Sequence, residues 1–223
     1  SQNTAYLAVA DFDAIPRLLR RLEAGLGGSL SAFEVMWPAF YDLVTTEPAK
    51  GKPPLPRGYP YYILVESLGG DKAADAERFE QVLGQALEDG LVIDAVIAKS
   101  QAEQAKMWAL RDDVGQVNRN GPAITFDVSL RIADMPAYVA EIEDKLRARW
   151  PKVDTYVFGH LGDGNLHVLV WPGEQGPGIK KAVEDIVYGP LEAIGGSVSA
   201  EHGIGLSKKA YLPMSRNAGE LAV

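Results

Sequence analysis

The sequence predicts an α+β fold in which helices pack on one face of a largely antiparallel sheet. Strand-like apolar runs alternate with amphipathic helical segments along the 223 residues. Two neighbouring strand-like segments, 153–158 and 166–171, are joined by a glycine-rich hairpin signal and not by a helix. Several strands alternate polar and apolar residues, which is typical of antiparallel sheets. We therefore expect ferredoxin-like βαβ pieces and not a doubly wound parallel sheet.

Four segments show apolar residues at helical spacing between start and stop residues. Asp13 and Asp134 are the expected N-caps of the first and third segments, and Pro136 lies in the first turn of the third. Gly189-Pro190 should kink or divide the fourth, because proline cannot donate the helical hydrogen bond. The expected helices are 13–25, 71–90, 133–150 and 178–196.

Strand-like runs rich in β-branched and aromatic residues lie between these helices. The proline-rich stretch 45–60 is expected to be a loop within one domain that spans 1–223, since the first strand needs partners beyond that loop. The expected strands are 4–10, 30–36, 61–68, 91–98, 123–130, 153–158 and 166–171.

The composition excludes several classes of function. A formal net charge of −8 without any basic patch argues against a nucleic-acid binder. The absence of cysteine excludes disulfides, thiolate zinc sites and cysteine nucleophiles, and it fits a reducing compartment, so we expect a cytoplasmic location. No apolar run approaches the roughly 18 residues of a spanning helix. Neither a GxGxxG nor a GxxxxGK[ST] phosphate-binding pattern is present.

All three histidines lie in two glycine-rich stretches, VFGHLGDGNLHVLV and SAEHGIG. Asp163-Gly164 in the first stretch is typical of a two-residue type I′ turn, and Asp163 and Asn165 are expected to be turn formers. That turn would place His160 directly opposite His167, with Cβ atoms about 4.5–5.5 Å apart. Two imidazoles in this arrangement can bind one metal ion at about 2.0–2.1 Å.

The second stretch adds Glu201 and His202. Two histidines and one carboxylate are a common catalytic metal set with open coordination positions, and a third histidine beside it would be a base. Each residue alone also has an ordinary structural explanation, because a cross-strand histidine pair can be surface decoration and Glu-His can cap a helix. The gathering of all three histidines with one glutamate in two glycine-framed stretches favours function.

Both stretches resemble the C-terminal domain of FAD-linked oxidases of the D-2-hydroxyacid dehydrogenase type. This group includes D-lactate and D-2-hydroxyglutarate dehydrogenases and the flavin subunit of glycolate oxidase, within the vanillyl-alcohol oxidase class of flavoproteins. The family patterns GH-x-GDGN-x-H and S-x-EHG-x-G-x-x-K match GHLGDGNLH and SAEHGIGLSK. WALRDDV and AITFDVSL are similar to upstream family segments, so the similarity extends over nearly the whole chain.

The resemblance implies a role for each of these residues. The metal ligands would be His160, His167 and Glu201, with zinc as the expected ion, while His202 would take the substrate proton and Arg111 would bind the substrate carboxylate. FAD would be held mainly by an N-terminal domain that is absent from this chain, as is the tail expected after ELAV. The chain alone is therefore expected to be inactive.

Two departures from the family concern the substrate. Thr125 stands where the hydroxyglutarate branch usually has lysine, and Leu169 stands where that branch has asparagine. Both are candidate substrate-binding residues, and they favour D-lactate or a longer monocarboxylic D-2-hydroxyacid. The expected partners are this small acid and an unidentified electron acceptor, without nucleic acid or a membrane span, and a homo-oligomer is left open.

Two other classes of function remain open at this point. A metal-dependent hydrolase could use the same two-histidine, one-glutamate set and would need no redox partner. A non-catalytic metal-stabilised module would gain stability from the metal but would bind no hydroxyacid.

Overall fold

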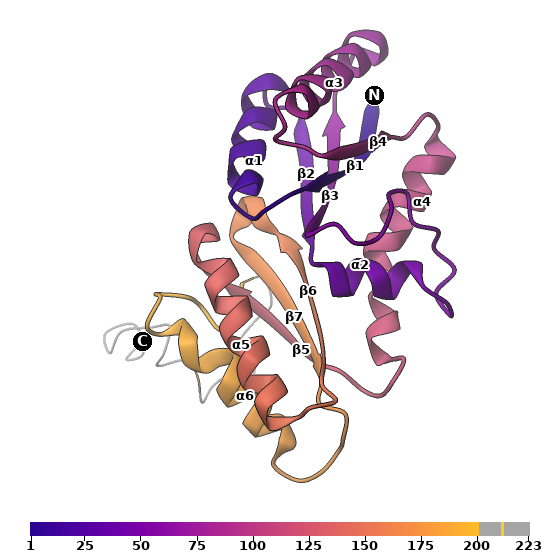
Figure 1. Cartoon of the computed structure of the whole chain (residues 1–223). Helices are drawn as coiled ribbons and strands as arrows, with labels where there is room; N and C mark the ends of the chain where they lie inside the picture. Colours follow the sequence, from indigo (N-terminus) through magenta and orange to yellow (C-terminus); the bar gives the residue numbers. More distant parts are fainter. Residues whose placement is uncertain (201–210, 212–223) are drawn as a thin grey trace. The chain divides into compact units, whose positions relative to one another are not determined.

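The computed structural model describes residues 1–200 and Tyr211. The chain divides into two compact units, Ser1–Gln116 and Val117–Val223, whose elements are labelled in Figure 1. Within each unit the paired strands of the described residues run antiparallel. Helices connect most of these strands along the chain. The predicted α+β class with an antiparallel sheet is therefore confirmed.

The first unit contains four strands in the order β4-β1-β3-β2. Two β-α-β pieces, β1-α1-β2 and β3-α3-β4, interleave in this order, so the expected ferredoxin-like pieces are present. The elements are β1 (Gln2–Val9), α1 (Ala14–Gly25), β2 (Leu30–Met36), α2 (Pro38–Thr45), β3 (Tyr61–Leu68), α3 (Lys72–Glu88), β4 (Asp94–Ile97) and α4 (Gln101–Asp112).

Helices α2 and α4, which the sequence pattern did not predict, pack on β1 through tyrosines. The ring of Tyr6 contacts Tyr41 of α2 at 6.0 Å, and its hydroxyl donates to the Met107 carbonyl of α4 at 3.2 Å. Tyr41 also stacks on Tyr62 of β3 at 3.6 Å. The Tyr41 hydroxyl donates to the Leu55 carbonyl and accepts from the Leu55 N–H, which ties the proline-rich loop to the core.

The helix ends follow the predicted pattern in part. Asp71 caps α3 by accepting from two backbone N–H groups, but Asp11 and not Asp13 accepts from the first N–H of α1. Asp134 makes no capping hydrogen bond either; its carboxylate accepts instead from Arg131 at 2.6 Å. Both residues stand at the predicted N-cap positions, but neither side chain makes the capping hydrogen bond, because a neighbouring partner competes for the same short side chain or N–H.

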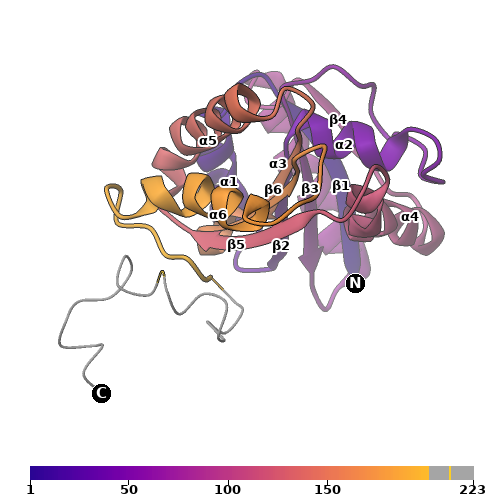
Figure 2. The same cartoon turned by 90° about the horizontal axis from the view of Figure 1, so that it is seen from below.

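The second unit contains three strands in the order β6-β7-β5. Helices α5 and α6 lie side by side on one side of these strands (Figures 1 and 2). Tyr138 of α5 donates to the Val187 carbonyl of α6 at 2.8 Å, and Phe126 of β5 meets Tyr188 of α6 edge to face at 5.2 Å. The elements are β5 (Ile124–Ser129), α5 (Met135–Arg149), β6 (Asp154–His160), β7 (Asn165–Trp171) and α6 (Ile179–Tyr188).

Short 3-10 turns connect several of these elements. The α-helical hydrogen bonds of α6 end at Tyr188, and a 3-10 turn at Gly189–Leu191 follows, as the Gly189-Pro190 pair predicts. Further 3-10 turns are Val114–Asn118, Ile132–Asp134 and Leu161–Asp163. Among the described helices none is both long and apolar enough to cross a membrane.

Candidate functional site

Strands β6 and β7 form the hairpin that carries two of the three histidines. Phe158, and not His160, lies opposite His167, so the predicted register is wrong by two residues. The predicted type I′ turn is also wrong. Leu161–Asp163 form a 3-10 turn, and Gly164, with φ of 68°, closes it by donating its N–H to the Leu161 carbonyl at 3.1 Å. A type I′ turn would require positive φ at Asp163 too, and no non-glycine residue of the described chain has it.

The register error leaves the histidines on the same face. Strand side chains alternate with a period of two, so an even shift returns each side chain to its own face.

The hairpin also depends on Gly159, because a Cβ there would lie 2.3 Å from the Asn165 carbonyl oxygen. Asn165 is not a turn former, as it begins β7 and is only 1% exposed. Within the described part of the chain its side-chain amide has no hydrogen-bond partner.

The three strands of the second unit present two different faces. One, the helix face, is apolar and packs towards α5 and α6; it consists of Ile124, Phe126, Val128, Val157, Leu166, Val168 and Val170. The other, which we call the histidine face, carries the polar side chains. By strand alternation and register it consists of Thr125, Asp127, Ser129, Tyr156, Phe158, His160, Asn165, His167 and Leu169.

His160 and His167 lie close together on the histidine face. Their ring centroids are 5.4 Å apart with an interplanar angle of 84°, and the His167 side chain is 12% exposed. An imidazole centroid lies about 3.2 Å from an ion bound at its nitrogen, so tetrahedral binding of two rings separates the centroids by about 5.2 Å. The spacing of the pair therefore fits a shared metal ion.

The third predicted ligand, Glu201, and the predicted base, His202, lie outside the described residues. In residues 1–200 and Tyr211 no group of three or more His, Cys, Asp or Glu side chains could hold a metal. The described residues thus supply two imidazoles of the predicted set, and the complete metal site remains a prediction.

Asp127 of β5 is a member of the histidine face that the sequence analysis did not select. It pairs with His167 in register, and its carboxylate Oδ1 lies 3.9 Å from the imidazole Nδ1. The residue is 3% exposed, and its Oδ2 accepts from the Ala200 N–H at 3.3 Å. An aspartate in the middle of the apolar run AITFDVSL was the available signal, since charged residues are seldom buried without a partner.

The segment that leads to Glu201 runs beside β5. Ser129 and Ser197 exchange two backbone hydrogen bonds, of 3.0 and 2.7 Å. Together with the hydrogen bond from Ala200 to Asp127, these bonds attach residues 197–200 to β5, the strand that pairs with β7. The first two residues of the second motif, Ser199 and Ala200, therefore belong to a segment attached to the same three-stranded sheet as the first motif.

Comparison with known proteins identifies the family. The whole chain, residues 1–223, matches the model for FAD linked oxidases, C-terminal domain. The chain belongs to this family. The resemblance inferred from the two histidine motifs is thereby confirmed.

Similar proteins support the assignment. The chain is 34% identical to a D-2-hydroxyglutarate dehydrogenase of Xanthomonas citri pv. viticola, over 99% of the chain and 47% of that protein. It is 36% identical to the mitochondrial D-2-hydroxyglutarate dehydrogenase of Rattus norvegicus, over 96% of the chain and 39% of that protein. The chain thus spans less than half the length of these relatives.

Solved structures share the fold at low identity. A p-cresol methylhydroxylase structure with bound substrate covers 89% of the chain and 45% of its own length, with a TM-score of 0.59 and 12% identity. An alkyldihydroxyacetonephosphate synthase structure covers 96% of the chain and 44% of its own length, with a TM-score of 0.62 and 10% identity. At these identities the likeness concerns the fold alone.

In this FAD-linked oxidase domain, Arg111 lies on α4 of the first unit. Its Nε donates to the Glu34 carboxylate of β2 at 2.9 Å, and the two side chains are 12% and 5% exposed. A buried carboxylate partner restrains the orientation of the planar guanidinium. The histidine pair belongs to the second unit, so the predicted substrate arginine and the predicted metal ligands come from different units of the domain.

The two predicted specificity residues of the domain lie opposite each other. Thr125 of β5 pairs with Leu169 of β7, and Tyr156 of β6 pairs with Leu169 from the other side. Thr125 is exposed, whereas Leu169 is buried with 1% exposure. Both lie on the histidine face: Thr125 is two residues from Asp127 on β5, and Leu169 is two residues from His167 on β7.

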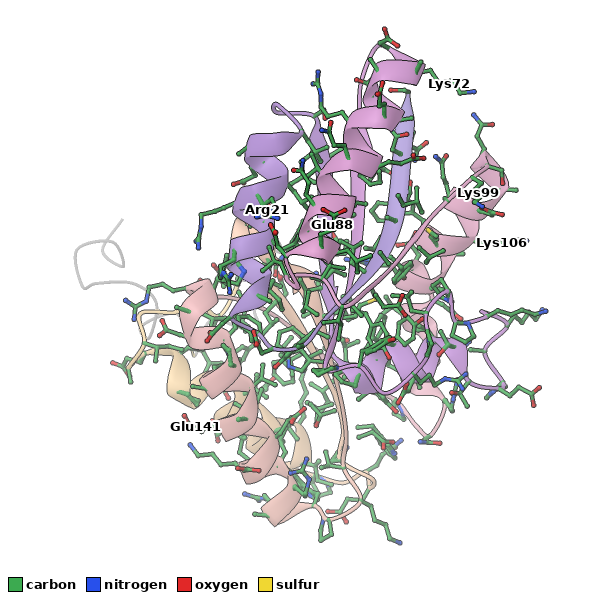
Figure 3. All side chains as sticks on the ribbon, turned by 45° about the horizontal axis from the view of Figure 1, so that its top comes forward. Arg21, Lys72, Glu88, Lys99, Lys106 and Glu141 are labelled. Atoms are coloured by element: carbon green, nitrogen blue, oxygen red, sulfur yellow. The ribbon has the colours of Figure 1, made fainter. Side chains whose placement is uncertain are left out.

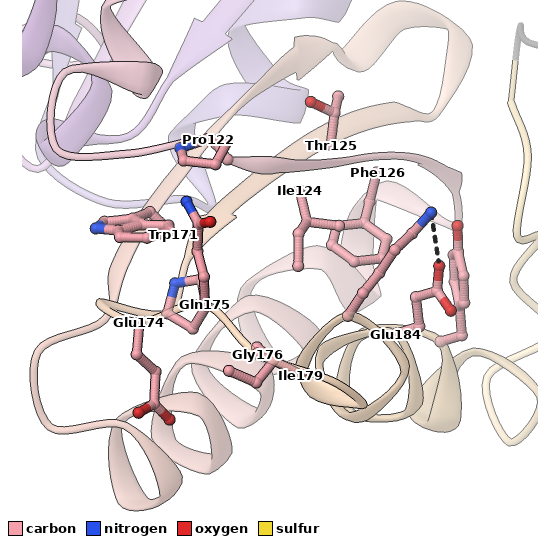
Figure 4. Close-up of a pocket in the computed structure, with 14 residues that line it drawn as sticks. Pro122, Ile124, Thr125, Phe126, Trp171, Glu174, Gln175, Gly176, Ile179 and Glu184 are labelled. Atoms are coloured by element: carbon pink, nitrogen blue, oxygen red, sulfur yellow. Dashed lines mark ion pairs between the residues drawn. The ribbon is translucent and has the colours of Figure 1, made fainter.

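A cavity of about 520 Å³ lies between β5, α6 and the segment after β7 (Figure 4). Ile124 and Ile179 contribute to its lining, and Lys180 forms an ion pair of 3.7 Å with Glu184 at its rim. In Figure 4 Thr125 projects to the opposite side of β5 from Ile124. The lining includes Thr125 of the histidine face, but neither His160 nor His167.

Proposed function

We propose that this chain is the substrate- and metal-binding domain of an FAD-dependent oxidoreductase that oxidises a D-2-hydroxyacid to the 2-oxoacid. The observation that carries the proposal is the pair of imidazoles, 5.4 Å apart on one sheet face, within the motif that resembles the family pattern. Relatives named as D-2-hydroxyglutarate dehydrogenases support the same chemistry. Since the chain spans less than half of these relatives, we place the FAD-binding domain in another part of the full-length enzyme.

His160, His167 and Glu201 would hold a divalent ion, with zinc as the expected metal. The ion would supply Lewis-acid chemistry and the flavin would supply the hydride acceptor. His202 would accept the proton of the α-hydroxyl, and Arg111 would bind the carboxylate through paired hydrogen bonds. The protein's own contribution is to orient the substrate and to remove the proton of its α-hydroxyl group.

The family assignment favours this oxidoreductase over the two alternatives from the sequence. A metal-dependent hydrolase or a metal-stabilised module could use the same histidines, but neither accounts for a match to FAD-linked oxidases along residues 1–223. An electron acceptor that reoxidises the flavin belongs to the proposal. The cytoplasmic location predicted from the absence of cysteine stays a prediction, and one of the relatives described above is named as mitochondrial.

Replacing His160 by alanine is expected to abolish binding of one equivalent of zinc. The substitution removes one of the two imidazole ligands of the proposed site. Thr155 lies on the same strand but on the opposite face, so it is not a metal ligand and its replacement serves as the control. Elemental analysis after reconstitution and dialysis measures the bound metal in the wild-type chain, in His160→Ala and in the control Thr155→Ala. Equal zinc content in His160→Ala and the wild type would refute the metal site.

The full-length enzyme is expected to prefer D-lactate or a longer monocarboxylic D-2-hydroxyacid to D-2-hydroxyglutarate. Thr125 offers a neutral hydroxyl and Leu169 offers no hydrogen bond, so a second carboxylate there lacks charge-assisted partners worth about 1.5–3 kcal/mol each. Three other cations could supply the missing charge: Lys99, Lys106 and Arg131, the last of which is already paired with Asp134 at 2.6 Å. Lys99 and Lys106 are exposed side chains of the first unit (Figure 3).

Comparison of kcat/KM for D-lactate and D-2-hydroxyglutarate tests this preference. Thr125→Lys with Leu169→Asn should move the ratio towards the dicarboxylate, while Lys99→Ala should leave it unchanged. A clear preference of the wild type for D-2-hydroxyglutarate, as the names of the relatives suggest for those proteins, would contradict the prediction.

A further inference from the structure

Asp127 is a buried carboxylate to which the proposed mechanism assigns no role. It occupies the middle of β5, is 3% exposed and lies on the histidine face. Burying a carboxylate costs several kcal/mol unless charges or hydrogen bonds compensate it. A residue that carries this cost in the centre of a strand, where valine or threonine would pack well, requires an explanation from its contacts.

The contacts of Asp127 connect the two histidine motifs. Its Oδ1 lies 3.9 Å from Nδ1 of His167, in the first motif. Its Oδ2 accepts from the N–H of Ala200, the residue that directly precedes Glu201 in the second motif. The backbone exchange between Ser129 and Ser197 attaches the same segment to β5 two residues further along the strand. One carboxylate thus lies between an imidazole and the segment that leads to the third predicted ligand.

The position of the carboxylate relative to the ring determines which nitrogen is available. A carboxylate on the Nδ1 side favours a proton on Nδ1 and leaves the Nε2 lone pair for a metal ion. The separation of 3.9 Å is longer than a hydrogen bond, so the carboxylate and the ring are neighbours that a small rotation of either side chain would bring into hydrogen-bonding distance.

We propose that Asp127 is a positioning residue of the metal centre. It sets the tautomer and orientation of His167 through Oδ1, and through Oδ2 it holds the backbone at Ala200, the residue that precedes Glu201 in the sequence. This inference rests on the proposed metal site and assigns to that site a residue outside both motifs. Loss of a partner of this kind weakens metal binding by about 10–100-fold.

The test compares Asp127→Asn with Asp163→Asn. Both substitutions remove one carboxylate charge from the hairpin region, but Asp163 is exposed in the turn, so it controls for a general electrostatic effect. Zinc affinity is measured by competition with a chelating dye. We expect the Kd of Asp127→Asn to rise by about 10–100-fold and that of Asp163→Asn to stay within about twofold of the wild type. A Kd unchanged in Asp127→Asn, or raised equally in both variants, overturns the proposal.

A second measurement does not depend on the folding of the variant. Long-range ¹H–¹⁵N NMR of the metal-free wild-type chain reports which nitrogen of each neutral histidine carries the proton, with assignment by single histidine replacement. We expect His167 to be protonated on Nδ1, and protonation on Nε2 would overturn the proposal.

The zinc titration separates failure of this inference from failure of the proposed metal site. If the wild type binds no zinc, both fail; if it binds zinc and Asp127→Asn binds equally well, the inference alone fails.

Discussion

Replacing His202 by asparagine in the full-length enzyme is expected to slow flavin reduction by about 10²–10⁴-fold, the usual range for loss of a general base. Oxidation of an alcohol by hydride loss leaves positive charge on the carbinol unless the hydroxyl proton departs. Asparagine retains polarity and approximate size but cannot accept this proton. Stopped-flow absorbance at saturating D-2-hydroxyacid measures the reduction rate.

The zinc content and the substrate Kd of the same variant provide the control. His202 is proposed as a base and not as a ligand, so both should remain close to the wild-type values. A reduction rate unchanged in His202→Asn would exclude the residue from proton transfer. Loss of zinc from the variant would instead make His202 a ligand and would require the proposed set of His160, His167 and Glu201 to be revised.

Replacing Phe126 by alanine is expected to lower the free energy of unfolding by about 3–5 kcal/mol, the typical cost of a buried phenylalanine. Phe126 is 1% exposed and lies on the helix face, where its ring meets Tyr188 of α6 at 5.2 Å. The substitution would remove this aromatic contact and leave a cavity between β5 and α6. Urea denaturation followed by circular dichroism measures the change.

Thr125 supplies the matched control, because it is the preceding residue of the same strand and is exposed on the opposite face. Thr125→Ala should change the free energy of unfolding by no more than about 0.5 kcal/mol. A cost below about 1 kcal/mol for Phe126→Ala would contradict the assignment of the helix face as the core of the second unit.

Segments with a strong periodic pattern were predictable, and segments with a weak one were not. Helix α3 has a buried stripe at Phe79, Val82 and Leu83 and a capping Asp71, and its position agrees with the prediction. Helix α4 buries only Gln104, Met107 and Leu110, and apart from the half-buried Trp108 its remaining residues are polar or small, so its sequence lacks a clear apolar stripe. Its position depends on tertiary contacts such as the hydrogen bond from Tyr6 to Met107.

The candidate site was predictable where chemistry and local spacing coincide. The histidine pair could be placed on one face because strand alternation depends only on parity, although the exact register depended on a turn whose conformation the Asp-Gly pair did not determine. Asp127 could not be recognised as a partner of His167, since the two are forty residues apart and meet only through the pairing of β5 with β7. Long-range pairing of this kind leaves no local signal in the sequence.

The two faces of the β5-β7-β6 sheet place adjacent residues under different selection. Phe126 and Val128 are constrained by the core, whereas Thr125 is exposed on the histidine face. Under the proposed function, substitutions on the histidine face would change the acid substrate while the scaffold persists. Evolvability in this domain would then follow from a two-residue alternation, and substrate range would diverge faster than fold.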